Sequence, residues 1–377
     1  MMAGIEAGKR GRRVLVVDHA ESPGEKIRIS GGGRCNFTNT RTSPKQFLSA
    51  NPRFAISALA RYKPEQFIAL VKSYGIAFHE KALGQLFCDG SAQQIINLLT
   101  TELGRAGVQL QLSTVIDSVE KTEAGFEVRL SSGLVTAQSV IIATGGKSIP
   151  KMGATGLGYR LAEQFGLAVT ETRPALVPLT FEPTALERLA PLSGISTNAV
   201  VSCNKAKFEE ALLFTHRGLS GPAILQASSY WREGDAIEID LLPGKNAVEI
   251  MQKARQDAPR IAMQTVLSAF LPKRLAQLLA EDIGITNQIG DVSDKKMQAA
   301  ATQLHHWTLK PVSSEGYRTA EVTLGGVDTA GLDSTTMQAR NVPGLFVVGE
   351  VVDVTGWLGG YNFQWAWSSG WAAGQAA

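Results

Sequence analysis

The sequence has few cysteines and no long hydrophobic run, and each absence excludes a class of protein. Its 377 residues include only three cysteines, Cys35, Cys88 and Cys203. They form no C-x-x-C pair, so we expect neither a structural zinc site nor a dithiol redox centre, and a reducing cytoplasm is the simplest location. The longest apolar runs, such as 14–17 and 140–143, are strand-sized. A bilayer span needs roughly 20 residues, so no membrane span is expected.

A strong excess of charge of one sign is also lacking. The formal net charge is +3, which does not by itself indicate a nucleic-acid partner. The helical segment 245–306 carries acidic residues among its basic ones, as a solvated surface does. We therefore expect a small-molecule substrate and no nucleic acid. The basic residues include Lys253, Arg255, Arg260, Lys273, Arg274, Lys295 and Lys296, and the acidic ones include Asp257, Glu281, Asp282, Asp291 and Asp294.

The first 18 residues have the pattern of half a dinucleotide-binding unit. Residues 1–10 favour a helix, and the apolar run Val14–Val17 predicts a buried parallel strand that ends in Asp18. A βαβ nucleotide unit has strand, glycine loop, helix, strand and a terminal acid in this order. Counting back from Asp18 places the glycines just before Met1, so we expect a first strand and glycine loop upstream of the given chain. The alternative is an ordinary helix–strand pair.

A glycine-rich stretch follows, from Gly24 to Asn39. Three consecutive glycines let backbone come very close to a flat or anionic ligand, and Arg28 and Arg34 can offset phosphate charge. The alternative is a flexible surface loop, although a linker would be more repetitive and less charged. We therefore interpret the stretch as a binding loop.

The rest of the chain alternates between strand-rich and helical segments. Two helices are expected, at 53–74 with a break at Pro64 and at 91–105 with Ser91 as cap. Short antiparallel strands are expected between 108 and 138. The later segments are a buried strand at 140–143 followed by Thr144-Gly145-Gly146, a strand-rich region at 175–243, a helical region at 245–306, strands at 308–327, and a last strand and helix at 341–377.

The C-terminal segment repeats the pattern of a short apolar strand closed by an acid. Leu345–Val348 leads into Gly349-Glu350, and a glycine-rich turn then precedes a helix that begins near Asn362. A helix N-terminus presents unpaired N–H groups and a partial positive charge. Such a terminus would stabilise the negative charge of a reduced flavin and tune its potential. Gly359 and Gly360 would allow the close approach.

These motifs resemble the YhiN/BaiN-type flavoprotein family, also described as aminoacetone oxidase family FAD-binding enzymes or NAD(P)/FAD-dependent oxidoreductases. The Ser-Gly-Gly-Gly-Arg-Cys-Asn and Gly-Gly-Tyr-Asn motifs carry a resemblance that covers essentially the whole chain and is nearest to the YhiN branch. It implies an α/β fold: a Rossmann-like FAD-binding domain of the two-dinucleotide-binding-domain flavoprotein type, with an inserted β-rich domain and a helical cap. The implied boundaries are 1–174 and 331–377 for the FAD-binding domain, 175–244 and 307–330 for the β-rich domain, and 245–306 for the helical insert.

The resemblance also implies a role for each part of the site. Asp18 would bind the adenosine ribose, and Ile116 would offer its backbone to adenine. Thr144 and Gly145 would support the dinucleotide. The residues implied at the pyrophosphate and flavin are Ser30, Gly31, Gly32, Gly33, Arg34, Cys35 and Asn36; those at the ribityl–phosphate region are Gly349 and Glu350; those at the flavin ring are Gly359, Gly360, Tyr361 and Asn362.

The family implies an enzyme. FAD would pass hydride to an unsaturated or oxo organic substrate, and NAD(P)H would dock transiently as the electron donor. The candidate proton donors are His216, Tyr317 and Tyr361, although His216 would also fit a purely structural place in its turn. Two alternatives remain open. One is a flavin-dependent tRNA-modifying enzyme, and the other is a flavoprotein that cannot hold FAD without the upstream loop.

Overall fold

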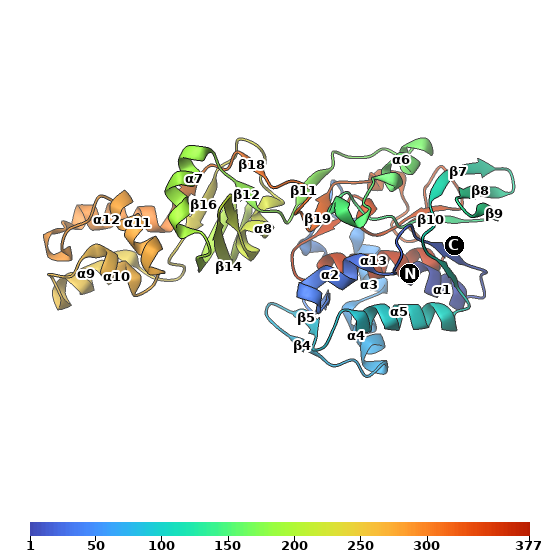
Figure 1. Ribbon diagram of the computed structural model, residues 1–377, viewed down its shortest axis with the longest axis horizontal. Helices are drawn as coiled ribbons and strands as arrows, with labels where there is room; N and C mark the ends of the chain where they lie inside the picture. The colour runs from blue at the N-terminus through green and yellow to red at the C-terminus, as the bar shows by residue number, and fades with distance from the viewer. The chain divides into compact units, whose positions relative to one another are not determined.

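The computed structural model describes all residues from 1 to 377 and divides into two units. The first unit contains Met1–Arg173 and Val322–Ala377, and the second contains Pro174–Glu321 (Figure 1). The first unit is therefore assembled from both ends of the chain, which is the arrangement expected when one domain is inserted in another. No helix in either unit has the length and apolar character needed to cross a bilayer.

The centre of the first unit contains two parallel strand pairs. β1 (Leu15–Val17) pairs with β6 (Gln109–Gln111), and β10 (Val140–Ile142) pairs with β20 (Leu345–Val347). Parallel strands need a crossover connection, which α5 (Gln93–Arg105) supplies between β1 and β6. The expectation that the segment around 108–112 joins the antiparallel strands is therefore wrong, because the chain leaving α5 returns alongside β1.

Three antiparallel strands follow β6 and form the small sheet that the alternating sequence predicts. β7 (Ile116–Thr122) pairs with β8 (Gly125–Leu130), and β8 pairs with β9 (Gly133–Ala137). Tight turns join them, and Val119 and Phe126 point into the core on the buried face. The chain then enters β10, so the sheet is an excursion between the two parallel pairs.

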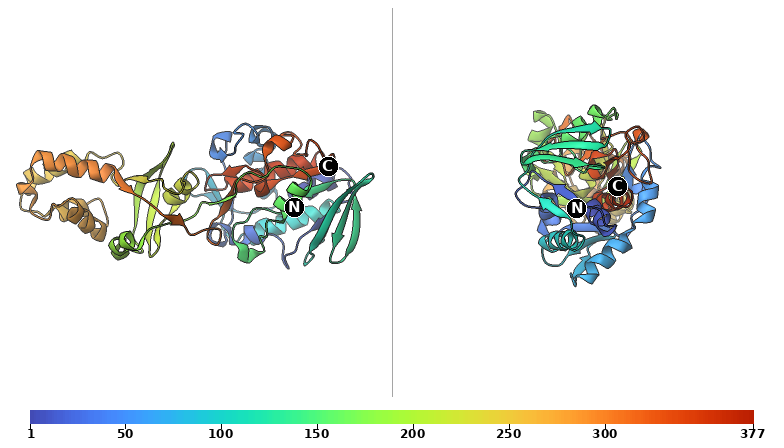
Figure 2. Two further views of the ribbon diagram at one scale, coloured as in Figure 1. Left: turned by 90° about the horizontal axis from the view of Figure 1, so that it is seen from above. Right: turned by 90° about the vertical axis from the view of Figure 1, so that its right-hand side faces the viewer.

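α13 (Tyr361–Gly374) forms the core of the first unit, and Figure 2 shows it in red among the blue N-terminal segments. It packs against α1 (Met2–Lys9) and α3 (Ala55–Arg61). Small residues permit the contact with α1, since a Cβ on Gly374 would lie 2.6 Å from the carbonyl oxygen of Ala3. The polar groups of α13 are satisfied inside the core: Gln364 donates to the carbonyl oxygen of Tyr62 at 3.0 Å, and the Ser368 hydroxyl donates to the same oxygen at 2.8 Å.

The remaining helices of the first unit begin where the sequence has helix-starting residues. α4 (Pro64–Ser73) starts at its proline, which confirms the expected break. α5 starts at Gln93, and its cap residue is Ala92 rather than the expected Ser91. The Ser91 hydroxyl nevertheless accepts a hydrogen bond from Gln93 N at 3.2 Å. The two shorter helices are α2 (Glu25–Ile29) and α6 (Leu157–Gln164).

A second small sheet in the first unit was not expected from the sequence. It has the order β2 (Asn36–Asn39), β5 (Gln85–Cys88) and β4 (Phe78–Glu80), all antiparallel. The interpretation of residues 36–39 as part of a loop is therefore wrong. Phe37 and its neighbours are buried and β2 contacts α13, and this packing orders a segment whose own composition favours turns. A further two-stranded antiparallel pair joins β3 (Phe47–Leu48) to β21 (Thr355–Gly356), which come from opposite ends of the chain.

The second unit is built on one seven-stranded antiparallel sheet. Its helical part, within 245–306, has apolar faces at helical spacing, as the sequence predicts. The last helix of this part, α12 (Asp294–His305), is tied to the segment after β16, because Leu241 N donates to the carbonyl oxygen of Leu304 at 3.0 Å. The strand order is β17 (Trp307–Leu309), β16 (Ile237–Asp240), β13 (Ser196–Cys203), β14 (Ala206–Thr215), β15 (Gly218–Ser220), β12 (Leu179–Thr180) and β18 (Ser313–Ser314), and the helices are α7 (Pro183–Leu189), α8 (Pro222–Ser228), α9 (Ala247–Asp257), α10 (Met263–Ser268), α11 (Lys273–Asp282) and α12 (Asp294–His305).

Candidate cofactor and substrate site

The glycine-rich loop after β1 is a rigid turn with left-handed backbone. Residues 31–33 have φ values of 58°, 66° and 82°, which glycine adopts without the steric cost that a Cβ brings. The loop is anchored at its end, because Cys35 N donates to the Ser30 carbonyl at 3.1 Å and Ala92 N donates to the Gly33 carbonyl at 2.8 Å. It is therefore held in place and is not a flexible surface loop.

Three glycines leave open space beside the backbone, as a ligand cradle requires. Gly32, Gly145 and Gly349 have φ values of 66°, 74° and 73°, and a Cβ at any of them would meet no atom within 4 Å. Gly145 and Gly349 follow β10 and β20, whose parallel register brings both carboxyl ends to one edge. Ligands of open α/β sheets bind outside this edge. The residues present therefore fit the dinucleotide FAD.

Gly359 and Gly360 are different, because protein atoms fill the space beside them. A Cβ on Gly359 would lie 2.9 Å from the Gln85 side chain, and one on Gly360 would lie 2.5 Å from the carbonyl oxygen of Thr38. With its amide oriented to satisfy its neighbours, Asn36 accepts a hydrogen bond from Gly360 N at 3.3 Å. These two glycines allow the turn before α13 to pack on the β2–β5–β4 sheet.

Glu350 joins three segments of the first unit through its two carboxylate oxygens. Oε2 lies 2.6 Å from Lys26 Nζ, and Oε1 accepts from the Ser148 hydroxyl at 3.0 Å and from the Thr323 N–H at 2.9 Å. Lys26 also donates to Ser148 at 2.8 Å. In this structure Glu350 therefore holds α2 and the loop after β10 together at the edge where Gly145 and Gly349 lie.

Asp18 and Ile116 come together at the other end of the predicted dinucleotide path. Asp18 lies at the carboxyl end of β1, and its carbonyl oxygen accepts a hydrogen bond from Thr114 N at 3.0 Å. Ile116 begins β7 two residues later. The Asp18 carboxylate accepts from the N–H of Ala20 at 3.0 Å and is about half exposed. Thr144, which follows β10, lies beside Gly158 in α6.

The two arginines of the loop differ in what they contact. The Arg28 guanidinium donates to Gln93 at 2.8 Å, to Glu25 at 3.3 Å and to the Pro23 carbonyl at 3.3 Å. Its donors are thus used within the protein and stiffen the loop. Arg34 is exposed, and its side chain forms no ion pair with a carboxylate.

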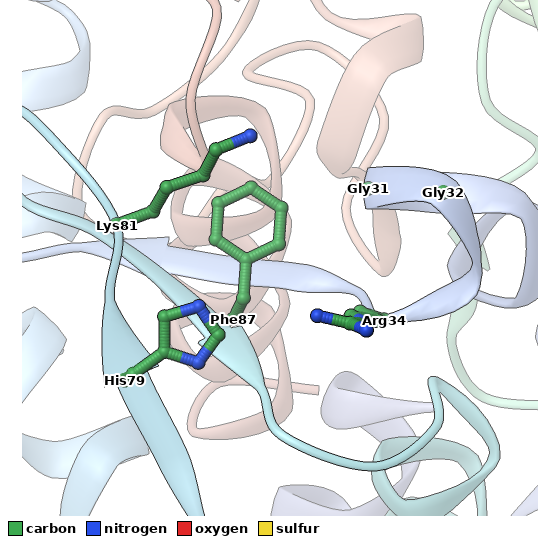
Figure 3. A pocket seen from close by; sticks show the side chains of 6 residues that line it. All are labelled: Gly31, Gly32, Arg34, His79, Lys81 and Phe87. Carbon is green, nitrogen blue, oxygen red and sulfur yellow. The ribbon is translucent and has the colours of Figure 1, made fainter.

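Beside this loop is a cavity of about 310 Å³. Figure 3 shows the Phe87 ring between the side chains of Lys81 and Arg34, with His79 alongside. Sequence reasoning missed His79, Lys81 and Phe87, which belong to the β4–β5 hairpin. Its strands carry no motif, and only the sheet brings them next to the glycine loop. The complete lining is Gly31, Gly32, Arg34, His79, Lys81 and Phe87.

Two of the three candidate proton donors, His216 and Tyr361, lie in different environments. His216 lies in the exposed turn between β14 and β15 of the second unit. Tyr361 is the first residue of α13 in the first unit, is buried, and packs its ring edge-on against Phe47 with centroids 6.2 Å apart. Asn362 uses its amide within the turn, since Oδ1 accepts from Gly356 N at 2.8 Å and Nδ2 donates to the Gly356 carbonyl at 2.8 Å.

The cysteine of the glycine loop is not an activated nucleophile. Burial raises the pKa of the Cys35 thiol to about 12, against a small opposing effect of its hydrogen bond with Ser30. Cys35 is fully buried, so it remains a neutral thiol at physiological pH. What it contributes to the site is backbone geometry, with a φ of 50°.

The fold agrees with the known proteins that this chain matches. The family described as "HI0933-like protein Rossmann domain" matches residues 1–376, and the chain belongs to this family of FAD-binding oxidoreductases. The Rossmann-type fold and the FAD cofactor that the sequence predicted are thereby confirmed.

Two relatives and one solved structure show the range of similar proteins. The chain is 50% identical over 381 residues to the "Ribosomal RNA dihydrouridine synthase" of Escherichia coli (strain K12), covering 100% of this chain and 94% of that protein. It is 28% identical to the "3-dehydro-bile acid delta(4,6)-reductase" of Clostridium scindens, covering 97% and 92%. A quinol-fumarate reductase with menaquinol shares the fold, with a TM-score of 0.50 and 15% identity over 99% of this chain and 68% of that one.

Proposed function

We propose that this protein is an FAD-dependent reductase that saturates the C5=C6 bond of a uracil base in ribosomal RNA, with NAD(P)H as the electron donor. The observation that carries the proposal is the 50% identity, over the whole chain, to a protein named for that product. This proposal replaces the preference for a small organic substrate that the modest net charge had suggested. It also brings forward the class of RNA-modifying enzymes, which the sequence left as an alternative.

The chemistry suits a bound flavin. The C5=C6 bond of uracil is conjugated to the C4 carbonyl, so hydride adds at C6 and a proton at C5, which consumes two electrons and two hydrogens in total. FAD, when bound, supplies that hydride, and NAD(P)H supplies the electrons. The name of the Clostridium relative describes reduction of double bonds in a 3-oxo compound. Reduction of a small conjugated ketone is therefore the second candidate function.

The chain's own residues support this chemistry by holding the cofactor and moving a proton. The open backbone at Gly32, Gly145 and Gly349 lets the dinucleotide approach closely, and the Lys26–Glu350 pair ties α2 to the segment that follows β20. For proton delivery at C5 we retain His216 and Tyr361 as the candidates. If one of them is the acid, its replacement (His216→Gln or Tyr361→Phe) is expected to lower kcat at least about 100-fold and to remove one limb of the pH profile.

The test is a reduction assay on defined RNA. Purified protein with its flavin content measured is incubated with unmodified ribosomal RNA transcripts and NADH or NADPH, and nuclease digests are examined by mass spectrometry. We expect a nucleoside two hydrogens heavier than uridine, formed only when protein and reductant are both present. Absence of this product, together with NAD(P)H oxidation that depends on a conjugated ketone, would replace the RNA proposal with the second candidate.

A further inference from the structure

The cavity beside the glycine loop has two cations that no carboxylate neutralises. Lys81 Nζ lies 5.5 Å from the centre of the Phe87 ring, and neither Lys81 nor Arg34 forms an ion pair. Other cations near the loop are paired: Lys26 with Glu350, and Arg28 with Glu25. Two exposed, unpaired cations on either side of one cavity make a site that attracts an anionic group such as phosphate.

Two carboxylates also lie on the hairpin, and each has a partner of its own. Asp89 Oδ1 lies 2.6 Å from His79 Nδ1, and Glu80 Oε1 accepts a hydrogen bond from Gly84 N at 3.1 Å. The Asp89 contact also fixes the orientation of the His79 ring at the cavity wall. Lys81 and Arg34 are therefore the charged side chains of the lining that have no carboxylate partner.

A flat aromatic surface lies between the cations. Phe87 is half-buried and packs against the loop, since a Cβ on Gly31 would lie 2.8 Å from its ring. The His79 ring lies nearly parallel to it, with an interplanar angle of 18° and centroids 6.2 Å apart. Single-stranded RNA is typically bound by aromatic rings that stack on bases next to cations that contact the backbone.

The size of the cavity limits the ligand. Ligand pockets span roughly 300–1,000 Å³, and about 310 Å³ is at the lower end of that range. A space of this size can take one nucleotide. The cavity nevertheless shares Gly31 and Gly32 with the cofactor loop, so a nucleotide held here would lie next to the cofactor.

We propose that the cavity lined by Arg34, His79, Lys81 and Phe87 binds the single nucleotide of the RNA that enters the site, with its phosphate between the two cations and its base or ribose against Phe87. This assignment rests on the proposed function and adds to it the recognition of single-stranded, locally unpaired RNA. It assigns a role to the side chains of the β4–β5 hairpin that line the cavity.

The test compares Lys81→Gln and Phe87→Leu with Lys72→Gln, an exposed lysine on α4 that serves as the matched control. Arg34 is left unchanged because it belongs to the cofactor loop. For each variant we measure bound FAD by absorbance, the affinity for a short uridine-containing single strand at several salt concentrations, and kcat and KM for ribosomal RNA reduction.

We expect Lys81→Gln to weaken RNA binding and to reduce the slope of log affinity against log salt by about one, as the loss of one phosphate contact does. Phe87→Leu is expected to raise the KM for RNA about tenfold through lost stacking. FAD content is expected to stay at the wild-type level in Lys81→Gln, and Lys72→Gln is expected to match the wild type throughout.

Two results would overturn the assignment. If Lys81→Gln binds RNA with the wild-type affinity and salt slope, the cavity does not contact phosphate. If it loses FAD instead, the cavity belongs to the cofactor. Failure of the proposed function gives a different pattern: RNA binding that depends on Lys81 and Phe87, but no reduced uridine from the wild-type protein, would support the nucleotide site and contradict the reaction.

Discussion

Nζ of Lys26 lies 2.6 Å from Oε2 of Glu350, although 324 residues separate them in the sequence. Lys26 belongs to α2, just before the glycine loop, and Glu350 follows β20 in the returning C-terminal segment. The pair therefore links the N-terminal and C-terminal segments of the first unit at the edge where Gly145 and Gly349 lie. Glu350 is mostly buried, with 15% of its side chain exposed, whereas Lys26 is 39% exposed.

Replacing Lys26 alone is expected to lower the free energy of unfolding more than replacing Lys26 and Glu350 together. Lys26→Met leaves the Glu350 carboxylate without a cation in a mostly buried place, so the free energy of unfolding is expected to fall by about 1–2 kcal/mol. In Lys26→Met/Glu350→Gln the unpaired charge is gone, and part of that loss is recovered. Urea unfolding followed by circular dichroism measures all members of the cycle, and strictly additive losses would show that the two side chains are not coupled.

Gly32→Ala is expected to abolish FAD binding while leaving the protein folded. The matched control is Gly75→Ala, because Gly75 has a φ of 64° against 66° for Gly32 and an equally open surrounding, but lies at the end of α4. Both variants carry the left-handed strain of about 1 kcal/mol. Flavin absorbance of the purified proteins and their Tm separate the two effects. Equal flavin content in both variants would remove Gly32 from the cradle.

The buried Asp353 predicts a distinct pH dependence. Burial raises the pKa of its carboxyl, and the charge of Asp328 adds to this, against a lowering by the hydrogen bond from Ala50 N at 2.9 Å. A carboxyl whose pKa is raised in the folded state contributes stability below its unfolded pKa of about 3.9. That contribution is lost as pH rises through the folded pKa. Asp353→Asn, which does not titrate, is therefore expected to gain stability relative to the wild type as pH rises from 4 to 7.

Glu102 serves as the control for Asp353, because its pKa is shifted in the opposite direction. Burial alone would raise its pKa, but hydrogen bonds from Tyr74, Lys9 and Arg105 lower it overall. Its contribution is present above the unfolded pKa of about 4.3 and is lost on acidification. Glu102→Gln is thus expected to destabilise at pH 7 and to approach the wild type at low pH. Urea midpoints from pH 4 to 8 measure both, and parallel curves for the two variants would contradict the assignment for Asp353.

The sequence predicted the elements whose signals are local. The apolar run before Asp18 became β1, Pro64 began α4, and the strand before Gly349 became β20. The β2–β5–β4 sheet was not predicted, because its strands are three or four residues long and are ordered by packing against α13 rather than by their own pattern. For the same reason the cavity residues on that sheet were missed.

Residue type alone did not distinguish the environments of the candidate site residues. From the sequence, both Gly32 and Gly360 were expected to allow close approach of the cofactor. In the structure, the space beside the backbone is open at Gly32 and filled at Gly360. Arg28 and Arg34 looked equivalent as phosphate partners, whereas Arg28 is already hydrogen-bonded within the protein. Such distinctions depend on neighbours far away in sequence. The upstream strand and glycine loop expected before Met1 stay a prediction.

The place of α13 in the core has a consequence for how the protein is made. A ribosome delivers Met1–Arg173 first and α13 last, with all of Pro174–Glu321 in between. Throughout that interval α1, α3 and β2 lack the helix against which they bury their apolar side chains. The second unit, by contrast, has every strand of its sheet before α13 emerges. The nascent cofactor-binding half must therefore wait in an incomplete state, exposed to aggregation or in need of a chaperone, until the final helix arrives.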